Sequence, residues 1–356
     1  MTNLRTTSLT LAQTLAAMSC ALLAVIPLLW LMGRPGWTVV ATLWEGPFGD
    51  RYRFCDALGR SCPLILCGLS VAVAFRCRAW NIGAEGQYVC GAILATAVGV
   101  HCGPPQAGPA WITLGVLIVA AALGGVVWAL VCALLEVYRR VPLVLGTILM
   151  NFVATGLLSY MVYGPLQGAD RSIPESESIS PSARLLTLVD GTDFHLGWYA
   201  AVLAAGVVWF LVHHTSAGFA LRAVGGNPVA ARFAGINVGR VTIAAMALSG
   251  ALAGLAGGMQ VAGVSYLLHV QAAEGFGYMG IAVALLARLH PLGVVLAGVA
   301  LAMLDVGAMH VERTTMLGVP ADLATAVKGV LILAVLVFSS AAVSRRLNRL
   351  AAGERA

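Results

Sequence analysis

Long apolar runs constrain this chain more than any other feature. Many contain about 15 to 25 residues, close to the roughly 20 that a helix needs to cross the hydrocarbon core of a bilayer. The chain of 356 residues is 60% apolar and only 10% charged, with a mean hydropathy of +0.90. That composition leaves too little polar surface to cover a soluble globule of this size. Because the alternating segments typical of barrel strands are absent, we predict an all-α polytopic membrane protein.

We expect one transmembrane domain over residues 1–356, with ten helices and both termini cytoplasmic. Ten crossings place most arginines on the cytoplasmic side, in agreement with the positive-inside rule. The net charge of +6 comes from arginine, because Lys328 is the only lysine. The first run is longer than the core of a signal peptide and is expected to remain as a span. The expected spans are 11–32, 63–75, 82–100, 111–137, 141–163, 196–212, 241–267, 276–287, 292–308 and 323–338.

Two of these spans, 63–75 and 276–287, are too short to cross a bilayer unaided. Each adjoins a polar, glycine-containing stretch, and interrupted spans in corresponding places of two halves indicate a transport path. Both stretches contain Ala-Glu-Gly followed closely by tyrosine, at 84–88 and 273–278. An inverted repeat of five spans each would place the two motifs at opposite membrane faces, with broken helices; so short a match also arises by chance.

Polar side chains inside lipid are costly, so they usually face a cavity or a partner helix. We expect a set of polar and aromatic residues to line the path of a polar solute, with the rings stacking on a ring-containing molecule. The alternative is that these groups join helices or anchor them at the interface. The expected path residues are Asn81, Glu85, Gln87, Tyr88, Asn151 and Phe152, with Trp80 and Tyr160 as further stacking candidates.

Glycines recur every four residues in the expected span 241–267, at Gly250, Gly254 and Gly258. This spacing predicts close approach of another helix. Lys328 lies within the last span, where we expect it to snorkel or to pair with Asp305 or Asp322.

The segment 218–240, between two apolar runs, is basic and contains one short helix signal. Asn227 suits the N-cap, Pro228 suits the first helical position, and Gly235 suits the left-handed residue after the last turn. A helix of about two turns is too short to be stable alone, so it requires a surface. We expect Val229, Phe233 and Ile236 to supply apolar contacts, while three arginines face water or a partner: Arg222, Arg232 and Arg240.

The sequence lacks the motifs of nucleotide hydrolysis, zinc proteases, dinucleotide binding and serine hydrolases. Its eight cysteines form no CxxC pair, and the neighbouring His213 and His214 are more typical of a solvated pair than of a metal site. We therefore expect no catalytic, cofactor or metal site in this chain. A disulfide remains an alternative among Cys55, Cys62 and Cys102.

Five motifs stand out together from Pro63 onward: NIGAEGQ at 81–87, TILMNF at 147–152, LRAVGGNPVAARFAGI at 221–236, IAVALLARLHPLG at 281–293 and the Gly318-Val319-Pro320 turn. With these motifs the chain resembles one family, the inner-membrane permeases of ATP-binding cassette (ABC) importers that serve simple sugars and nucleosides. Many relatives have a glutamate near Leu143 and a glutamine near Lys328; both differences bear on the solute.

The resemblance implies a bacterial-type inner-membrane location, a second similar permease around a central path, and a binding protein or lipoprotein that delivers the solute. It favours nucleosides over sugars, and it places ATP and magnesium on a partner ATPase, with no nucleic acid involved. It implies that residues 215–240 couple to that ATPase. The coupling residues carried over are Arg222, Gly226, Asn227, Pro228, Ala231, Phe233 and Gly235. A simple-sugar permease and an ATP-independent transporter or channel are the alternatives.

Overall fold

The computed structural model describes Ile26, Trp30, Gly329 and residues 36–101, 110–171 and 173–314. Apart from these isolated residues, the expected spans 11–32 and 323–338 lie outside the described residues, as do Cys102, Asp322 and Lys328. The described residues form helices joined by loops and contain three isolated β-bridges but no strand.

The helices account for all eight expected spans that fall within the described residues. Six are long and apolar enough to cross a membrane, and two more, α4 and α11, are shorter or more polar. The α-helices are α2 (Gly36–Phe48), α3 (Arg51–Arg76), α4 (Ala84–His101), α5 (Ala110–Arg139), α6 (Leu143–Tyr163), α7 (Gly197–His214), α8 (Ser216–Gly226), α9 (Pro228–Phe233), α10 (Val238–Gln260), α11 (Phe276–Leu286) and α12 (Pro291–Arg313). A π-helical turn, η2 (Val261–Ser265), continues α10, and the 3-10 turns are η1 (Pro181–Ala183) and η3 (Val270–Ala272). The prediction of an all-α, multi-pass membrane protein is confirmed.

The expected short span 63–75 is wrong, because α3 has 26 residues and begins at Arg51. The carboxylate of Asp50 caps it by accepting a hydrogen bond of 3.1 Å from the backbone N–H of Tyr52. The first turns are polar, so hydropathy alone does not detect them. Pro63 lies inside the helix, which membrane proteins tolerate where neighbouring elements surround the break. The helix α2 also occupies a part of the chain that we expected to be a loop.

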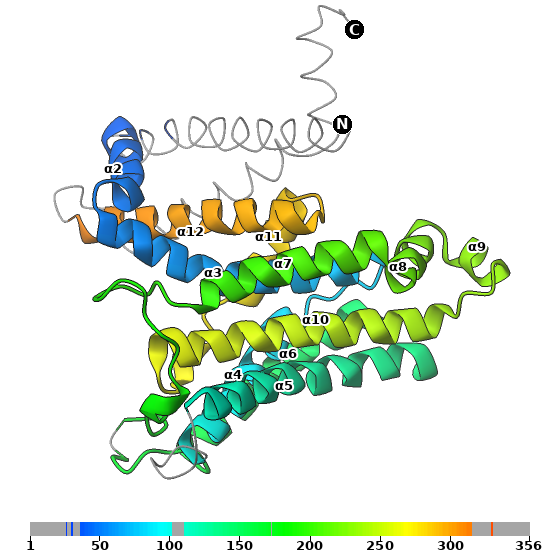
Figure 1. Ribbon diagram of the computed structural model, residues 1–356, viewed down its shortest axis with the longest axis horizontal. Helices are drawn as coiled ribbons and strands as arrows, with labels where there is room; N and C mark the ends of the chain where they lie inside the picture. The colour runs from blue at the N-terminus through cyan, green and yellow to red at the C-terminus, as the bar shows by residue number, and fades with distance from the viewer. Residues whose placement is uncertain are drawn as a thin grey trace, which may run out of the picture.

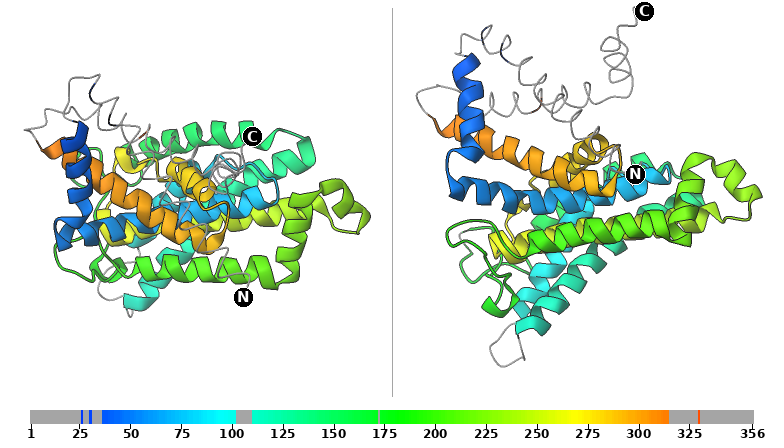
Figure 2. Two further views of the ribbon diagram at one scale, coloured as in Figure 1. Left: turned by 90° about the horizontal axis from the view of Figure 1, so that it is seen from above. Right: turned by 45° about the horizontal axis from the view of Figure 1, so that its top comes forward.

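The long helices run between two ends of the bundle (Figure 1). The pair α8 and α9 extends beyond α7 at one end, which we call the α9 end, in all three views (Figures 1 and 2). Residues 164–196 lie at the opposite end, which we call the loop end.

The glycines of α10 bring three helix backbones together. A Cβ added at Gly250 would overlap the carbonyl oxygen of Gly125 in α5, and one added at Gly254 would overlap that of Ala121. On α4, a Cβ at Gly91 would overlap the backbone of Gly254. The prediction of close packing along α10 is therefore confirmed. α4, α5 and α10 form a block beside α3, which is 89% buried over its most apolar stretch, compared with 28% for α6 and α7.

Two helices begin inside the bundle, and their first turns meet. α3 runs to the α9 end, residues 77–83 return, and α4 runs to the loop end. In the second half α10 runs to the loop end, residues 266–275 return, and α11 runs to the α9 end. This inverted correspondence supports broken helices and an internal repeat. The expectation that the two Ala-Glu-Gly motifs lie at opposite faces is wrong, because Glu85 is hydrogen-bonded to Gly275. The two motifs lie at the first turns of α4 and α11, which meet inside the bundle.

Candidate coupling surface and solute path

The helix α9 has the local geometry that its sequence predicts. The side-chain Oδ1 of Asn227 accepts hydrogen bonds from the backbone N–H groups of Val229 at 3.0 Å and Ala230 at 3.2 Å. Pro228 occupies the first turn, and Gly235 has φ of +81°. The N–H of Ile236 bonds to the carbonyl of Ala231, as expected after a left-handed residue. Asn227 also ends α8, so the two helices share one elbow.

The apolar side chains of α9 divide into two groups. Ala231 is buried at 4% exposure, and Ile236 packs partly against the core of the chain. Phe233 and Val229 face away from the chain and are 90% and 61% exposed. Large apolar residues left exposed beside arginines are typical of a surface that a partner covers. Of the carried-over residues, Phe233 is therefore left open on the surface, whereas Ala231 packs α9 against its own chain.

Positive charge gathers at the α9 end. Among the described residues, this end carries eight arginines and one acidic residue, Glu136. Arg222 is half-buried and its Nη1 has no hydrogen-bond partner in the described part of the chain, whereas Arg232 and Arg240 are exposed. Burial, followed by the charges of Arg76 and His213, lowers the pKa of His290. The eight arginines are Arg76, Arg78, Arg139, Arg140, Arg222, Arg232, Arg240 and Arg288.

Glu85 joins the two helix starts inside the bundle. Its Oε1 accepts a hydrogen bond of 2.9 Å from the backbone N–H of Gly275, and its Oε2 accepts one of 2.7 Å from that of Gly277. The first N–H groups of a helix have no partner within the helix and carry partial positive charge, so a carboxylate satisfies them. Glu85 is 3% exposed. The arrangement gives it a connecting role between α4 and α11.

Asn81 and Gln87 belong to a second buried network. The Asn81 amide donates to Gln87 Oε1 at 3.1 Å and to the Oγ of Ser249 at 2.9 Å, and its Oδ1 accepts from the N–H of Gly83. Ser249 in turn bonds to Ser70 of α3. These contacts connect the loop before α4 to α3 and α10. No local pattern predicted the pairing of Ser70 and Ser249, which lie 179 residues apart.

Asn151 uses both ends of its amide within the chain. Its Oδ1 accepts from the N–H of Gly86, and its Nδ2 donates to the carbonyl of Ile82 at 3.0 Å and to the hydroxyl of Tyr278 at 3.2 Å. It thereby attaches α6 to the beginnings of α4 and α11. Asn151 is 2% exposed.

The expected stacking residues differ in exposure. Tyr88 is 1% exposed and packs near Phe276, with the ring centroids 5.9 Å apart. Phe152 is 69% exposed on α6, next to Asn151, and Tyr278, bonded to Asn151, is 47% exposed. These two rings are open to a ligand or partner, whereas Tyr88 is enclosed. Trp80 and Tyr160 are exposed too, and Trp80 packs edge-on against Phe75.

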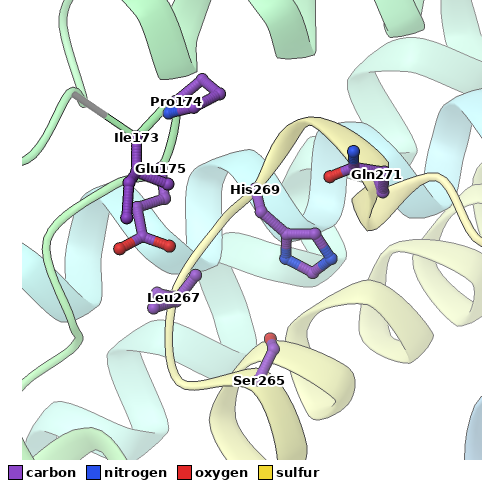
Figure 3. Close-up of a pocket in the computed structure, with 7 residues that line it drawn as sticks. All are labelled: Ile173, Pro174, Glu175, Ser265, Leu267, His269 and Gln271. Atoms are coloured by element: carbon purple, nitrogen blue, oxygen red, sulfur yellow. The ribbon is translucent and has the colours of Figure 1, made fainter. Parts of the chain in front are cut away.

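A pocket of about 540 Å³ opens at the loop end (Figure 3). It lies between the loop that begins at Ile173 and the segment that returns from η2 towards α11. The two walls are joined, because the N–H of Ser176 donates to the carbonyl of Leu268. Part of its lining, His269 and Gln271, belongs to the stretch that precedes α11, and no lining residue is among the expected path residues. It is lined by Ile173, Pro174, Glu175, Ser265, Leu267, His269 and Gln271.

Residues 54–337 match the family described as the branched-chain amino acid transport system / permease component. The chain belongs to this family. The permease is 37% identical over 297 residues to the guanosine ABC transporter permease protein NupP of Bacillus subtilis, covering 82% of this chain and 83% of the relative. It is 34% identical over 294 residues to the glucose ABC transporter permease protein TsgB13 of Haloferax volcanii, covering 80% and 76%. It is 28% identical over 281 residues to the nucleoside ABC transporter permease protein NupB of Lactococcus lactis, covering 76% and 75%. It is thus a transport component.

The permease also contains a charged cluster that the sequence analysis missed. Arg60 Nε donates to Asp305 Oδ2 at 3.1 Å, and Arg60 Nη2 lies 4.0 Å from Glu274 Oε2. Asp305, which we expected as one alternative partner of Lys328, pairs with Arg60. The prediction for Lys328 itself lies outside the described residues. Asp305 is a single charge inside an apolar run, which indicates a buried polar contact, but no local pattern identifies Arg60 as its partner.

His195 is enclosed at the loop end of the permease. It is fully buried between Gly197 and Gly263, where an added Cβ at either position would contact its ring. Nδ1 accepts a hydrogen bond from the N–H of Gly197 at 3.1 Å, so the proton of the neutral ring lies on Nε2, which has no partner among the described residues. Burial lowers the pKa of His195 to about 4.

No group of three or more possible metal ligands occurs among the described residues. The ring of His213 lies near that of His290, with the centroids 5.8 Å apart and the planes tilted by 43°. Cys55 and Cys62 are free thiols.

Proposed function

We propose that this permease imports nucleosides as one of two similar subunits around a central path, energised by a cytoplasmic ABC ATPase. ATP and magnesium bind to that ATPase, and an extracytoplasmic binding protein or lipoprotein delivers the solute. The chain itself carries out no hydrolysis. The observation that carries the coupling role is the 90% exposure of Phe233 on a short helix that its own chain caps.

The orientation follows from charge. The positive-inside rule assigns the end with eight arginines and one acidic residue to the cytoplasm. The loop end, where the acidic residues of 164–196 lie, then faces outward and receives the binding protein. If the expected spans 11–32 and 323–338 each cross once, both chain termini are cytoplasmic too, and the membrane is a bacterial-type plasma membrane.

The solute assignment rests on the relatives and on the exposed rings beside Asn151. Two of the relatives are named as guanosine or nucleoside permeases. Phe152 and Tyr278 offer aromatic faces on which a purine or pyrimidine can stack. Four polar residues act without contacting the solute, because they fix the first turns of α4 and α11 beside these two rings. They are Asn81, Glu85, Gln87 and Asn151. The pocket at the loop end is the entrance to the same path.

Transport proceeds by alternating access. Solute released at the loop end enters between the helices, and closure of the ATPase subunits on ATP moves α9. Movement of α9 shifts the bundle from an outward-open to an inward-open arrangement.

The test uses the complex that co-purifies with the tagged permease from its native membrane, reconstituted into proteoliposomes. We expect uptake of tritiated guanosine that requires ATP and the binding protein, and that excess unlabelled uridine or adenosine reduces. Excess glucose or ribose should leave uptake unchanged. Competition by a sugar alone would instead support a sugar permease, in line with the glucose relative. Gradient-driven flux through the purified chain without an ATPase would contradict the importer.

A further inference from the structure

We propose that Arg76 is the positioning residue through which movement of α8 and α9 reaches both broken helices. This inference rests on the proposed function, since it concerns the step between the ATPase contact and the switch in access. It arises from three contacts that meet at the last turn of α3.

The first contact is between α8 and the end of α3. A Cβ added at Gly225 would overlap the carbonyl oxygen of Arg76, so the two backbones touch with no side chain between them. Arg78 Nη2 also donates a hydrogen bond of 3.0 Å to the carbonyl of Gly226. Because Gly226 adjoins the Asn227 elbow, a displacement of α9 is delivered directly to this turn of α3.

The second contact joins Arg76 to the turn between α11 and α12. Arg76 Nε donates a hydrogen bond of 2.8 Å to the carbonyl of Leu289. Arg288 and Leu289 are both left-handed, with φ of 50° and 60°. The N–H of Leu289 bonds to the carbonyl of Ala284 at 2.8 Å. The turn is therefore fixed to the end of α11 and moves with it.

The third contact lies at the other end of α11, where Glu85 accepts hydrogen bonds from Gly275 and Gly277. A shift of α11 therefore reaches the first turn of α4. The route consists of α9, α8, Arg76, α11, Glu85 and α4. Packed side chains, hydrogen bonds and rigid helices of this kind can carry coupling between separated sites.

Within the described part of the chain, the guanidinium of Arg76 forms no ion pair with a carboxylate, which distinguishes it from a residue that serves only in an ion pair. Its neighbours from the packed elements include Arg222 of α8 and His290 of the α11–α12 turn, both of which are basic. Arg76 is held in this basic environment by backbone contacts. Such an arrangement suits a residue that follows the backbone movement of two elements.

The experiment compares three variants with the unaltered complex in proteoliposomes, using tritiated guanosine. Arg76→Met removes the donor to Leu289, Arg76→Lys keeps a cation that can reach the same carbonyl, and Gly225→Ala forces α8 away from α3. Gly206→Ala in α7 is the control, because nothing lies within 4 Å of its added Cβ. Each sample is measured for ATP hydrolysis stimulated by the binding protein and for guanosine uptake.

We expect Arg76→Met and Gly225→Ala to raise the ATP hydrolysed per guanosine imported by about tenfold, a typical size for a coupling between sites, while hydrolysis stays within about twofold. Arg76→Lys should retain most of the coupling, and Gly206→Ala should match the unaltered complex. A parallel loss of hydrolysis and uptake in Gly225→Ala, with Arg76→Lys no better than Arg76→Met, would overturn the inference. So would normal coupling in Arg76→Met. If the unaltered complex shows no ATP-dependent uptake, the proposed function itself fails.

Discussion

Oε2 of Glu85 accepts a hydrogen bond of 2.7 Å from the backbone N–H of Gly277, although 192 residues separate them. This contact and its companion at Gly275 attach the start of α11 to the start of α4. Because the carboxylate is buried at 3% exposure, water cannot replace either bond.

Glu85→Gln should weaken this junction. The amide has one acceptor oxygen and would point an N–H₂ group at one of the two glycine N–H donors, which leaves buried donors unsatisfied at a cost of about 1–3 kcal/mol. We expect a lower thermal unfolding midpoint in detergent and reduced guanosine uptake. Glu177→Gln, at an exposed position of the loop end, is the matched control. An unchanged midpoint in Glu85→Gln would show that the two hydrogen bonds contribute nothing to stability.

Phe233→Ala should separate assembly from folding. Phe233 is 90% exposed, so removal of its ring leaves the packing of the chain intact. The free energy of unfolding of the variant should therefore stay within about 0.5 kcal/mol of that of the unaltered permease. Loss of a central apolar contact should weaken ATPase retention, with a cost of roughly 2 kcal/mol or more in binding. The measurement is the amount of ATPase that co-purifies with the tagged permease.

Ala231→Leu is the contrasting variant on the same helix. Ala231 is 4% exposed, and overpacking of such a site typically costs about 1–3 kcal/mol. We expect it to lower both the unfolding midpoint and ATPase retention by displacing α9. If Phe233→Ala retains all of the ATPase, the docking surface does not include the exposed face of α9.

Phe152→Ala tests the stacking face. Stacking of a base on an aromatic side chain is worth about 1–3 kcal/mol, so the KM for guanosine should rise by roughly tenfold while basal ATP hydrolysis stays unchanged. Phe210→Ala, which removes a ring of 57% exposure from α7, is the control. Equal effects of both substitutions would indicate a general response to lost aromatic surface and no specific solute contact.

The stability of the permease should fall in mild acid because of His195. The pKa of His195 is about 4 in the folded chain and near 6.5 when unfolded, so below pH 6.5 the unfolded state binds a proton that the folded state does not. The neutral His195 ring therefore makes its full contribution to the free energy of unfolding above pH 6.5. That free energy decreases by up to about 3 kcal/mol as the pH falls to 4.

The measurement is the unfolding midpoint of the detergent-solubilised protein at pH 7.5 and pH 5. His195→Asn keeps an acceptor for the N–H of Gly197 but cannot titrate in this range. We expect its midpoint to fall less between the two pH values than that of the unaltered protein. Parallel decreases in the two proteins would mean that other groups cause the acid sensitivity.

Local chemistry explains why some features were predictable. The α9 helix depends on Asn227, Pro228 and Gly235, all within nine residues, and the structure contains it as expected. The spacing of Gly250 and Gly254 likewise predicted close helix contact. Such signals are contained in a few turns of chain and do not depend on the rest of the fold.

Other features depend on partners that are far apart in sequence. Asn151 could be recognised as polar within a span, but its bonds to Ile82 and Tyr278 cross 69 and 127 residues. Hydropathy also could not show that α3 begins at Arg51, because a polar helical turn resembles a loop in composition. The pairing of Arg60 with Asp305 was unpredictable for the same reason, since no local pattern specifies it.

The contact between Gly125 and Gly250 has a consequence for how the subunit can deform. Where carbonyl groups and α-carbons meet directly, there is no compressible layer to absorb relative displacement, so the helices on either side keep their mutual register. The trio α4, α5 and α10 therefore acts as a stiff reference body against which other parts change position. Bulkier residues at the glycine contacts of these three helices would impair the permease by changing how the helices are packed, even at positions that the solute does not contact.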